Sequence, residues 1–351
     1  MDAVKCLYKM KIAYIIYPFV IFSNRSNGIR SQAITWAELL RNKGHQVDLV
    51  NNWGDYNWKN YDAIHFFGPG EWSIGLMSAI GTINAHVFYS PIIDPFLFNR
   101  KKEKIKLKLA MKSGFRYQTP FCSEMHSLKS ANHILVRSSY EKDYVQEMYD
   151  IEDNRISVVP LSVSSAIEKA SSSIDLASFS SDRENFVLHI SSIYQPRKNV
   201  IRLIRAAKKY KFKLILAGNP GSEKDMALLK QEIGDYSDIK ILGFISEEKK
   251  MELYSKAKVF ALPSICEGVG IVAVDAAYCG CDIVITNDGG PKEYYNHLAL
   301  EVSPYDIDDI GQACCRLLGE ETFQPELSSH IRQYYSGEKI AQLLESVYKQ
   351  L

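Results

Sequence analysis

The sequence predicts an α/β protein made of two doubly wound parallel-sheet domains in tandem. Short runs rich in β-branched and aromatic residues alternate with segments of helical periodicity, as in parallel strands joined by crossover helices. The alternation stops at a serine-rich stretch, residues 162–185, and then starts again. A chain of 351 residues is also long for a single hydrophobic core. We therefore predict domains at 1–165 and 185–325, a linker at 166–184, and C-terminal helices at 326–351 that return to the first domain.

Composition and charge exclude several classes of protein. Hydrophobic residues make up 46% of the chain and charged residues 24%, as in folded soluble proteins. The formal net charge of +1 argues against a dedicated nucleic-acid binder, so we expect no nucleic-acid partner. The seven cysteines have no framework spacing and no C-x-x-C pair, which favours reduced thiols, a cytoplasmic location and no metal site. The apolar run 12–22 contains Pro18 and is too short to span a bilayer.

In the first domain, residues 11–17 are predicted to form a buried strand, which a polar loop at 23–31 follows. A helix is expected over 32–45, because apolar residues recur there at helical spacing and Gly44 provides a C-terminal stop. The remaining strands of this domain are predicted at 46–51, 61–68, 86–93, 133–138 and 156–162.

The second domain repeats the pattern. Strands are predicted at 185–193, 213–218, 239–244, 259–264 and 281–286, and helices at 199–210, 223–234, 246–257 and 270–279. Ligands of open α/β sheets bind outside the carboxyl ends of the strands, so two domains that face each other across a cleft would share one site. No G-x-G-x-x-G follows the first strand, which disfavours a dinucleotide dehydrogenase.

The segment 266–284, CEGVGIVAVDAAYCGCDIV, contains two carboxylates in an otherwise apolar run. Gly268 and Gly270 permit a sharp turn before a helix, whose N-terminal amides and dipole suit an anion such as a diphosphate. Buried carboxylates are costly unless they are hydrogen-bonded. One interpretation is therefore that Glu267 and Asp275 bind ligand hydroxyls on the two sides of a phosphate. The alternative is that both have partners within the chain, with Glu267 capping the helix and Asp275 paired with a nearby lysine.

The stretch EGVGIVAVDAAYCGCDIVITNDGGPKEYY resembles the E-x7-E signature of retaining glycosyltransferases of the GT-B fold, family 4, known as group 1. The resemblance implies two Rossmann-like domains facing across a cleft, with a nucleotide-diphosphate sugar as donor substrate and no cofactor. Asp275 stands where the family has glutamate, which shortens the carboxylate that would reach the ribose. The donor-binding residues that the resemblance implies in this stretch are Glu267, Gly268, Val269, Gly270, Ile271 and Asp275.

A second motif, SSIYQPRKNV, is similar to the family segment whose arginine and lysine hold the donor diphosphate. Lys198 matches the family lysine. Ser192 occupies the arginine position, and we expect Arg197 to substitute for it. Cations at this place would neutralise the charge that develops on the leaving diphosphate. The alternative is a solvated helix start, but cations there oppose the helix dipole. We take Glu267, Lys198 and Arg197 as the candidate catalytic residues.

In the first domain, the resemblance places Gly28 in the loop that approaches the donor phosphate. His65 and Asp94 match positions on the acceptor side, although a histidine at a strand end is more often structural. The histidine that the family often has before this aspartate is Ile93 here, so we name no general base. The GT-B fold needs no D-x-D metal motif, and we expect a metal-independent enzyme.

Residues 100–116 form a strongly basic segment with eight Lys or Arg and one Glu, so its net charge is +7 and that of the remainder is −6. Leu107 and three further apolar residues, Ile105, Leu109 and Met111, lie between the lysines. A basic amphipathic helix binds anionic membranes, and we predict such a contact at the cytoplasmic leaflet. A solvated helix with extended lysines is the alternative.

The sequence thus predicts a retaining, hexosyltransferase-like enzyme that transfers a sugar to a glycan or lipid-linked acceptor in surface polysaccharide biosynthesis. We expect it in the cytoplasm, peripheral to the membrane. Two alternatives stay open at this point. One is a nucleotide-sugar epimerase of the same fold, and the other is a non-catalytic nucleotide-sugar-binding protein, which the changes at Ser192 and Ile93 would allow.

Overall fold

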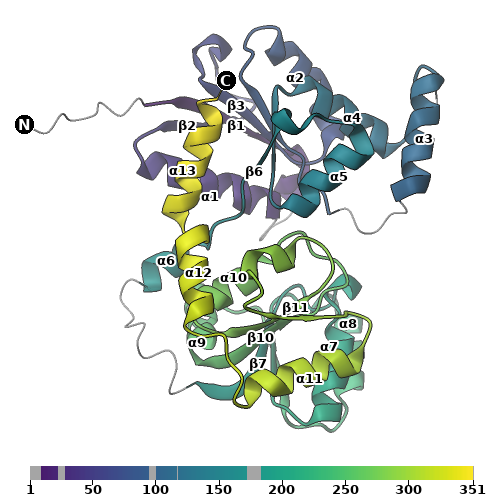
Figure 1. Ribbon diagram of the computed structural model, residues 1–351, viewed down its shortest axis with the longest axis vertical. Coiled ribbons are helices and arrows are strands. Elements are labelled where there is room, and N and C mark those ends of the chain that lie inside the picture. The colour runs from purple at the N-terminus through teal and green to yellow at the C-terminus, as the bar shows by residue number, and fades with distance from the viewer. Residues whose placement is uncertain (1–8, 23–27, 95–99, 117, 172–182, 351) are drawn as a thin grey trace, which may run out of the picture. The chain divides into compact units, whose positions relative to one another are not determined.

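The computed structural model describes residues 9–22, 28–94, 100–116, 118–171 and 183–350. The chain divides into an N-terminal unit, Met1–Pro160 with Glu338–Leu351, and a C-terminal unit, Leu161–Gly337 (Figure 1). Each unit is built on a parallel sheet of six strands with helices around it. This architecture confirms the predicted α/β class with two doubly wound domains. The expected cleft between the domains stays a prediction.

The N-terminal unit has the strand order β2-β1-β3-β4-β5-β6, and every described pairing in it is parallel. Its strands are β1 (Lys11–Ile16), β2 (Gln46–Leu49), β3 (Ala63–Phe67), β4 (Val87–Ser90), β5 (His133–Val136) and β6 (Ile156–Val158). Its α-helices are α1 (Gly28–Asn42), α2 (Ile74–Gly81), α3 (Arg100–Lys112), α4 (Pro120–Ser130), α5 (Ser139–Tyr149) and most of α13 (Gly337–Tyr348). Short 3-10 turns include η1 (Pro18–Phe22), η2 (Trp58–Asn60) and η3 (Gly70–Trp72).

The C-terminal unit has the order β12-β11-β10-β7-β8-β9, so β10 and β7 lie side by side in the middle of the sheet. Its strands are β7 (Glu184–Ile190), β8 (Leu214–Ala217), β9 (Ile239–Gly243), β10 (Ala257–Leu262), β11 (Asp282–Thr286) and β12 (Leu300–Val302). Its helices are α6 (Ser165–Ser171), η7 (Pro196–Lys198), α7 (Val200–Tyr210), α8 (Glu223–Ile233), α9 (Glu247–Lys256), α10 (Ile271–Tyr278), η8 (Pro291–Tyr295), α11 (Ile307–Leu318) and α12 (Glu326–Tyr335).

The boundaries of the units differ from the predicted ones. The C-terminal unit begins at Leu161, and α6 occupies part of the predicted linker, because Val163 and Ile167 are buried in the core of that unit. Residues 172–182 of the linker lie outside the described residues. The C-terminal tail divides at Gly337: α12 buries Leu327 in the C-terminal unit, whereas Glu338–Leu351 belong to the N-terminal unit. Strand β12 and helix α11 were not expected.

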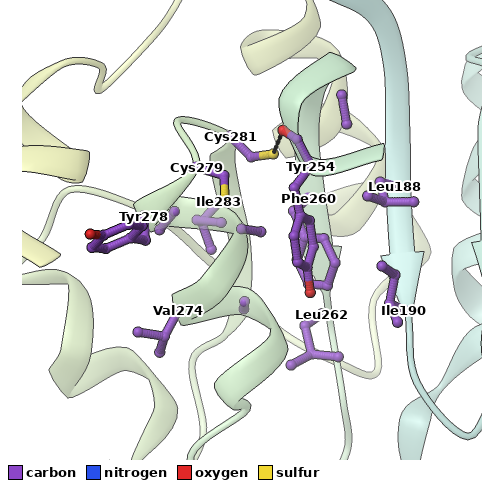
Figure 2. Packing of buried hydrophobic residues seen from close by; sticks show 14 of the residues in the cluster. Leu188, Ile190, Tyr254, Phe260, Leu262, Val274, Tyr278, Cys279, Cys281 and Ile283 are labelled. Carbon is purple, nitrogen blue, oxygen red and sulfur yellow. Dashed lines mark hydrogen bonds between the residues drawn. The ribbon is translucent and has the colours of Figure 1, made fainter. Parts of the chain in front are cut away.

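The core of the C-terminal unit explains the apolar runs of its strands. Figure 2 shows Leu188 of β7 and Phe260 and Leu262 of β10 among the side chains of one buried cluster, to which α10 adds Val274. A second cluster covers the other face of the same strands. A parallel sheet that is covered on both faces needs apolar side chains at consecutive positions, so its strands lack the alternation of a half-exposed sheet.

A buried carboxylate lies in the N-terminal unit. Glu124 of α4 accepts hydrogen bonds from the Tyr89 hydroxyl of β4, at 2.6 Å, and from the Gly70 amide of η3, at 2.8 Å. Burial raises the pKa of Glu124 to about 7, although these two hydrogen bonds act in the opposite direction. Since the carboxylate joins a helix, a strand and a turn, its protonation state affects the packing of all three.

We expect Glu124→Gln to remove part of the pH dependence of stability. The folded pKa lies above the unfolded value, so the native state binds more protons between pH about 4.5 and about 7. The free energy of unfolding should therefore fall as the pH rises through this window, by on the order of 3 kcal/mol from this group. Urea unfolding at several pH values measures the difference between the wild type and the variant. The exposed Glu152→Gln is the control, and equal pH slopes for wild type and Glu124→Gln would contradict the expectation.

Candidate functional site

The candidate site is built on two loops at the carboxyl ends of the central strands β7 and β10. The loop after β7 contains residues 191–199, and the loop after β10 contains residues 263–270. The Ile265 amide donates to the Arg197 carbonyl at 2.8 Å, which joins the two loops through their backbones. Because parallel strands end at the same edge of a sheet, these loops stand where ligands of open α/β sheets bind.

Asn199 fixes the two loops in place. Its side-chain amide donates to the carbonyls of Pro263, at 2.8 Å, and Pro304, at 2.6 Å, so it connects three loops of one edge. Its backbone has a φ of 60°, a left-handed conformation that asparagine adopts more readily than most residues. Sequence reasoning missed this residue, although it belongs to the RKN part of the motif that resembles the family.

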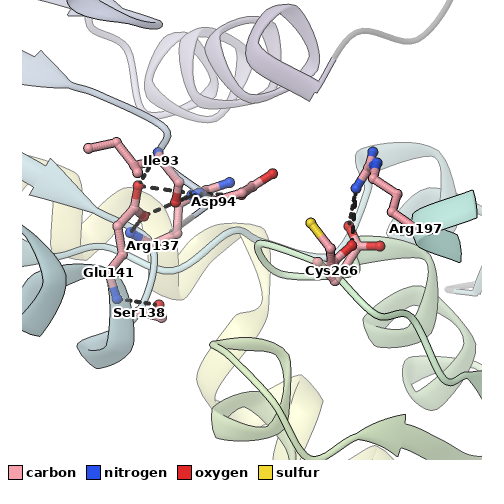
Figure 3. A network of polar contacts seen from close by, with 8 residues as sticks. Ile93, Asp94, Arg137, Ser138, Glu141, Arg197 and Cys266 are labelled. Carbon is pink, nitrogen blue, oxygen red and sulfur yellow. Dashed lines mark hydrogen bonds and ion pairs between the residues drawn. The ribbon is translucent and has the colours of Figure 1, made fainter. Parts of the chain in front are cut away.

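The structure brings the three candidate catalytic residues together. Lys198 and Glu267 form an ion pair in which about 10% of the lysine and 11% of the glutamate side chain is exposed. The Arg197 guanidinium lies 4.0 Å from the Glu267 carboxylate and donates to the Cys266 carbonyl at 3.2 Å (Figure 3). Two cations beside one carboxylate leave an excess positive charge at the edge of the sheet, which suits an anionic ligand.

The loop after β10 leads directly into α10. Gly270 precedes the helix with a φ of 72°, and a Cβ atom there would lie 2.7 Å from the Leu262 side chain, so this position requires glycine. Val269 packs into the core, while Gly268 and Ile271 are half-buried. The first turn of α10 therefore stands next to Glu267, and a helix N-terminus with its dipole is the kind of place where backbone amides bind anions.

The neighbouring strand β8 ends in a close backbone approach. A Cβ atom at Gly218 would lie 1.9 Å from the Ser191 carbonyl oxygen, and φ is 110°. His189 of β7 lies below this loop, and its Nδ1 is 2.8 Å from the Ala261 carbonyl, which can only accept. Nδ1 therefore carries the proton and Nε2 accepts from the Ser191 hydroxyl. Burial, with a contribution from Lys198, lowers the pKa of His189 to about 4, so the ring is neutral and structural.

Asp275 has hydrogen-bond partners within the chain, and its role in donor binding stays a prediction. The side chain is buried within α10, and its two oxygens accept from the backbone amide of Ser164, at 2.9 Å, and from the Ser164 hydroxyl, at 3.0 Å. The second carboxylate of the signature thus has partners within the chain, the other alternative that the sequence left open. Its hydrogen-bond partner is a serine, and the charge of Lys250 also acts on it. Burial raises the pKa of Asp275, while Lys250 and the two hydrogen bonds from Ser164 act in the opposite direction.

Tyr295 of η8 is a polar residue that sequence reasoning missed. Its hydroxyl is buried and has no hydrogen-bond partner among the residues that the structure describes. Burial raises its pKa well above the usual value, and the carboxylates of Asp275 and Glu267 add to this shift. The hydroxyl therefore keeps its proton and can donate a hydrogen bond. No motif in the sequence distinguishes it from neighbouring tyrosines.

His65 is not on the acceptor side of the N-terminal unit, as the sequence had suggested, but in its core. It is fully buried on β3, with Nδ1 2.7 Å from the Tyr348 hydroxyl of α13 and Nε2 2.9 Å from the Ser90 hydroxyl. Tyr348 in turn lies 2.9 Å from the Tyr14 hydroxyl. Burial lowers the pKa of His65 well below its usual value. The histidine anchors the C-terminal helix to the sheet, and a charged reaction partner cannot reach it.

The other two predicted residues of the N-terminal unit have different surroundings. Asp94 forms an ion pair with Arg137 at 3.1 Å, and Arg137 also pairs with the buried Glu141 at 2.9 Å (Figure 3). About 39% of the Asp94 side chain is exposed, so it stays an acceptor-side candidate. Gly28 is the first residue of α1, with open space beside it, and its expected approach to a phosphate stays a prediction.

The described residues provide neither a group of metal ligands nor a membrane-spanning helix. Within those residues, no three His, Cys, Asp or Glu side chains are grouped so that they could hold a metal ion. Likewise, none of the described helices combines the length and the apolar character needed to cross a bilayer.

We expect Ser164→Ala to destabilise the C-terminal unit, because it removes one of the two hydrogen bonds to the buried Asp275. The expected loss is about 1–3 kcal/mol in the free energy of unfolding, with no change in nucleotide binding. Urea unfolding and calorimetry measure the two quantities, and the exposed Ser237→Ala serves as the control. Weaker nucleotide binding at unchanged stability would instead return Asp275 to the donor site.

Known proteins are similar to this chain in sequence and in fold. Residues 173–335, a little under half of the chain, match the family described as glycosyl transferases group 1. The chain is 27% identical over 208 residues to the O-antigen chain mannosyltransferase B of Escherichia coli, which covers 56% of this chain and 54% of that protein. The match thus spans about half the length of this curated relative.

Solved structures show the same fold over nearly the whole chain. Sucrose-phosphate synthase from Thermosynechococcus elongatus superposes with a TM-score of 0.72 at 17% identity and covers 97% of this chain and 98% of its own. Anabaena HepE, solved in complex with UDP and glucose, gives a TM-score of 0.67 at 17% identity over 97% of this chain and 100% of its own. The fold is therefore GT-B.

Proposed function

We propose that the protein is a retaining glycosyltransferase that moves a hexosyl group from a nucleotide-diphosphate sugar to a glycan or lipid-linked acceptor in surface polysaccharide biosynthesis. The observation that carries the proposal is the Lys198–Glu267 ion pair, which lies beside Arg197 and the N-terminus of α10. The similarity to a mannosyltransferase of O-antigen chains makes mannosyl donors the first to test.

The donor diphosphate binds to the amides at residues 268–271 and to the two cations. Lys198 has only Glu267 as its anionic partner in the described site, and a diphosphate offers it a second one. When Lys198 turns to the phosphate, the Glu267 carboxylate gains capacity to accept a hydrogen bond from a sugar hydroxyl. The ion pair thus keeps both side chains ordered before the donor arrives, which reduces the entropy that binding costs.

The transfer step breaks the bond between the anomeric carbon and the diphosphate oxygen, and forms a bond from the acceptor hydroxyl oxygen on the same face of the sugar. The acceptor proton passes to the leaving phosphate oxygen. Configuration at the anomeric carbon is retained because the acceptor attacks the face from which the diphosphate leaves. Negative charge develops on the diphosphate in the transition state, and Arg197 and Lys198 stabilise it there. With two fixed cations in this place, the reaction proceeds without a metal ion.

We expect Glu267→Gln and Lys198→Met each to lower kcat/KM about 100- to 1,000-fold, since each removes a charge at the reacting centre. Steady-state kinetics with uridine and guanosine diphosphate sugars measure this, and the exposed Glu223→Gln and Lys224→Met are matched controls. Glu267→Gln leaves Lys198 without its carboxylate, and Lys198→Met leaves Glu267 with Arg197 alone. Breaking a buried ion pair in this way costs about 3–5 kcal/mol, so the double variant, Lys198→Met with Glu267→Gln, keeps the test valid if one single variant fails to fold. Donor binding without transfer or hydrolysis in the wild type would favour a non-catalytic binding protein instead.

We also propose that α3 carries the enzyme to an anionic membrane at the cytoplasmic face. Leu107 and Ala110 of this helix are buried in the N-terminal unit, while Ile105 and Leu109 are about 60% exposed. Lys101, Lys108 and Lys112 recur at helical spacing with these two apolar side chains. An exposed face of alternating lysine and large apolar residues is that of a helix which lies in the membrane interface.

We expect the triple variant Lys101→Gln, Lys108→Gln, Lys112→Gln to weaken binding to phosphatidylglycerol vesicles by roughly 100-fold, at about 1 kcal/mol for each charge. Co-sedimentation measures the partition coefficient, and wild-type binding should fall with rising salt. A triple change of exposed lysines in the C-terminal unit, Lys224, Lys230 and Lys240 to Gln, is the control. Equal binding to phosphatidylcholine and phosphatidylglycerol vesicles would refute the membrane role.

A further inference from the structure

The N-terminal unit has a concave surface at the edge of its sheet opposite to the carboxyl ends of the strands. Two adjoining hollows, of about 580 and 590 Å³, share Lys59 and Ile83. The lining comes from residues 55–62, which lead into β3, and from residues 83–86, which lead into β4. We call this surface the aromatic groove. Its volume lies in the range of small-molecule and oligosaccharide sites.

Two half-buried aromatic rings, Tyr56 and Trp58, line the groove, and Trp58 packs against the buried Tyr61. The Tyr56 and Trp58 rings are 5.3 Å apart and inclined by 33°, and the Trp58 and Tyr61 rings are 5.9 Å apart and inclined by 37°. Tyr56 and Trp58 are half-buried and pack on the core of the unit, so one part of each ring is held and another stays accessible. Ile83, which is 45% exposed, extends this apolar platform.

The groove is held in shape by hydrogen bonds. The side-chain amide of Asn84 donates to the carbonyls of Trp58 and Tyr61, both at 2.8 Å, and its oxygen accepts from the His86 amide at 2.8 Å. The Tyr61 hydroxyl donates to Asp48 at 2.7 Å. The aromatic surface therefore exists before a ligand arrives, and binding costs little ordering of the loop.

The rim of the groove is polar and nearly neutral. Asn57 and Asn60 are exposed, and each amide can both donate and accept. Asp55 and Asp62 contribute negative charges and Lys59 a positive one. An anionic lipid or nucleic acid would meet no excess of positive charge here, in contrast to α3. The chemistry matches a neutral ligand that has apolar faces and many hydroxyl groups.

We propose that the aromatic groove binds a neutral glycan, with the apolar C–H face of a hexose on Trp58 and Tyr56 and its hydroxyls on Asn57 and Asn60. Burying the C–H face against an aromatic ring removes apolar surface from water, and the amides replace the water bound to the hydroxyls. The proposal rests on the proposed function for the source of this ligand, which is the growing polysaccharide. Because the groove lies away from the carboxyl ends of the strands, it holds a part of the polysaccharide that does not take part in the reaction.

Affinity electrophoresis of the full chain in native gels that contain α-mannan, or dextran as a second neutral polysaccharide, tests the proposal. We expect retardation of the wild type in at least one gel, and an at least tenfold weaker dissociation constant for Trp58→Ala. Trp58→Phe should retain most of the binding. Trp53→Ala is the matched control, because Trp53 is 96% exposed and does not line the hollows. If Trp58→Ala fails to fold, the exposed pair Asn57→Ala with Asn60→Ala should lower binding at unchanged stability.

The test separates this proposal from the proposed function. Glu267→Gln should keep full retardation, since Glu267 belongs to the other unit. Retardation that depends on Trp58 in a protein without transferase activity would refute the proposed function alone. Sugar transfer without retardation in either gel, or equal retardation of wild type and Trp58→Ala, would overturn the groove as a glycan site. A change of oligomeric state in Trp58→Ala with no retardation of the wild type would overturn it as well, in favour of a contact between copies of the chain.

Discussion

The candidate site depends on the hydrogen bonds that join the loops after β7 and β10. The Ile265 amide bonds to the Arg197 carbonyl, and the Asn199 side chain bonds to Pro263. These bonds hold together the backbones of two loops that are 60 to 70 residues apart in the chain. The fixed backbones place the side chains of Lys198 and Glu267 within contact distance of each other. Since a buried ion pair with poor geometry does not repay its desolvation, the pair is stable only because the backbone has fixed this geometry.

The two carboxylates of one signature segment have opposite roles. Glu267 stands in a loop beside two cations, where a ligand can compete for its hydrogen bonds. Asp275 lies one helix turn further into the core, and Ser164 occupies both of its oxygens. The shorter side chain explains the difference, because an aspartate on α10 keeps its carboxylate close to the helix, within reach of the Ser164 backbone. The same segment thus contributes Glu267 to the candidate site, while Asp275 of α10 binds Ser164 just before α6.

Much of the fold and half of the site could be predicted from the sequence. The central strands are continuous apolar runs, which a doubly covered parallel sheet requires, so their positions follow from composition alone. Lys198 and Glu267 could be found because they belong to short motifs that end such strands. The buried state of His65 could not be found, because its partner Tyr348 is far away in the chain. Strand β12 has three residues, too few for a periodic signal, and α6 is stabilised by tertiary burial of Ile167 and not by its own pattern.

The N-terminal unit separates charge from apolar surface between the two edges of its sheet. At the carboxyl edge, Arg137 is shared by the carboxylates of Asp94 and Glu141. At the amino edge, the aromatic groove has no excess of positive charge, and hydrogen bonds hold its shape. An enzyme that extends a polymer needs both properties, because the reacting end requires polar groups that can move, whereas the remainder of the chain requires a fixed surface that binds any repeat of the same sugar. Charged side chains at one edge and aromatic side chains at the other therefore fit a single polysaccharide that contacts both edges of the sheet.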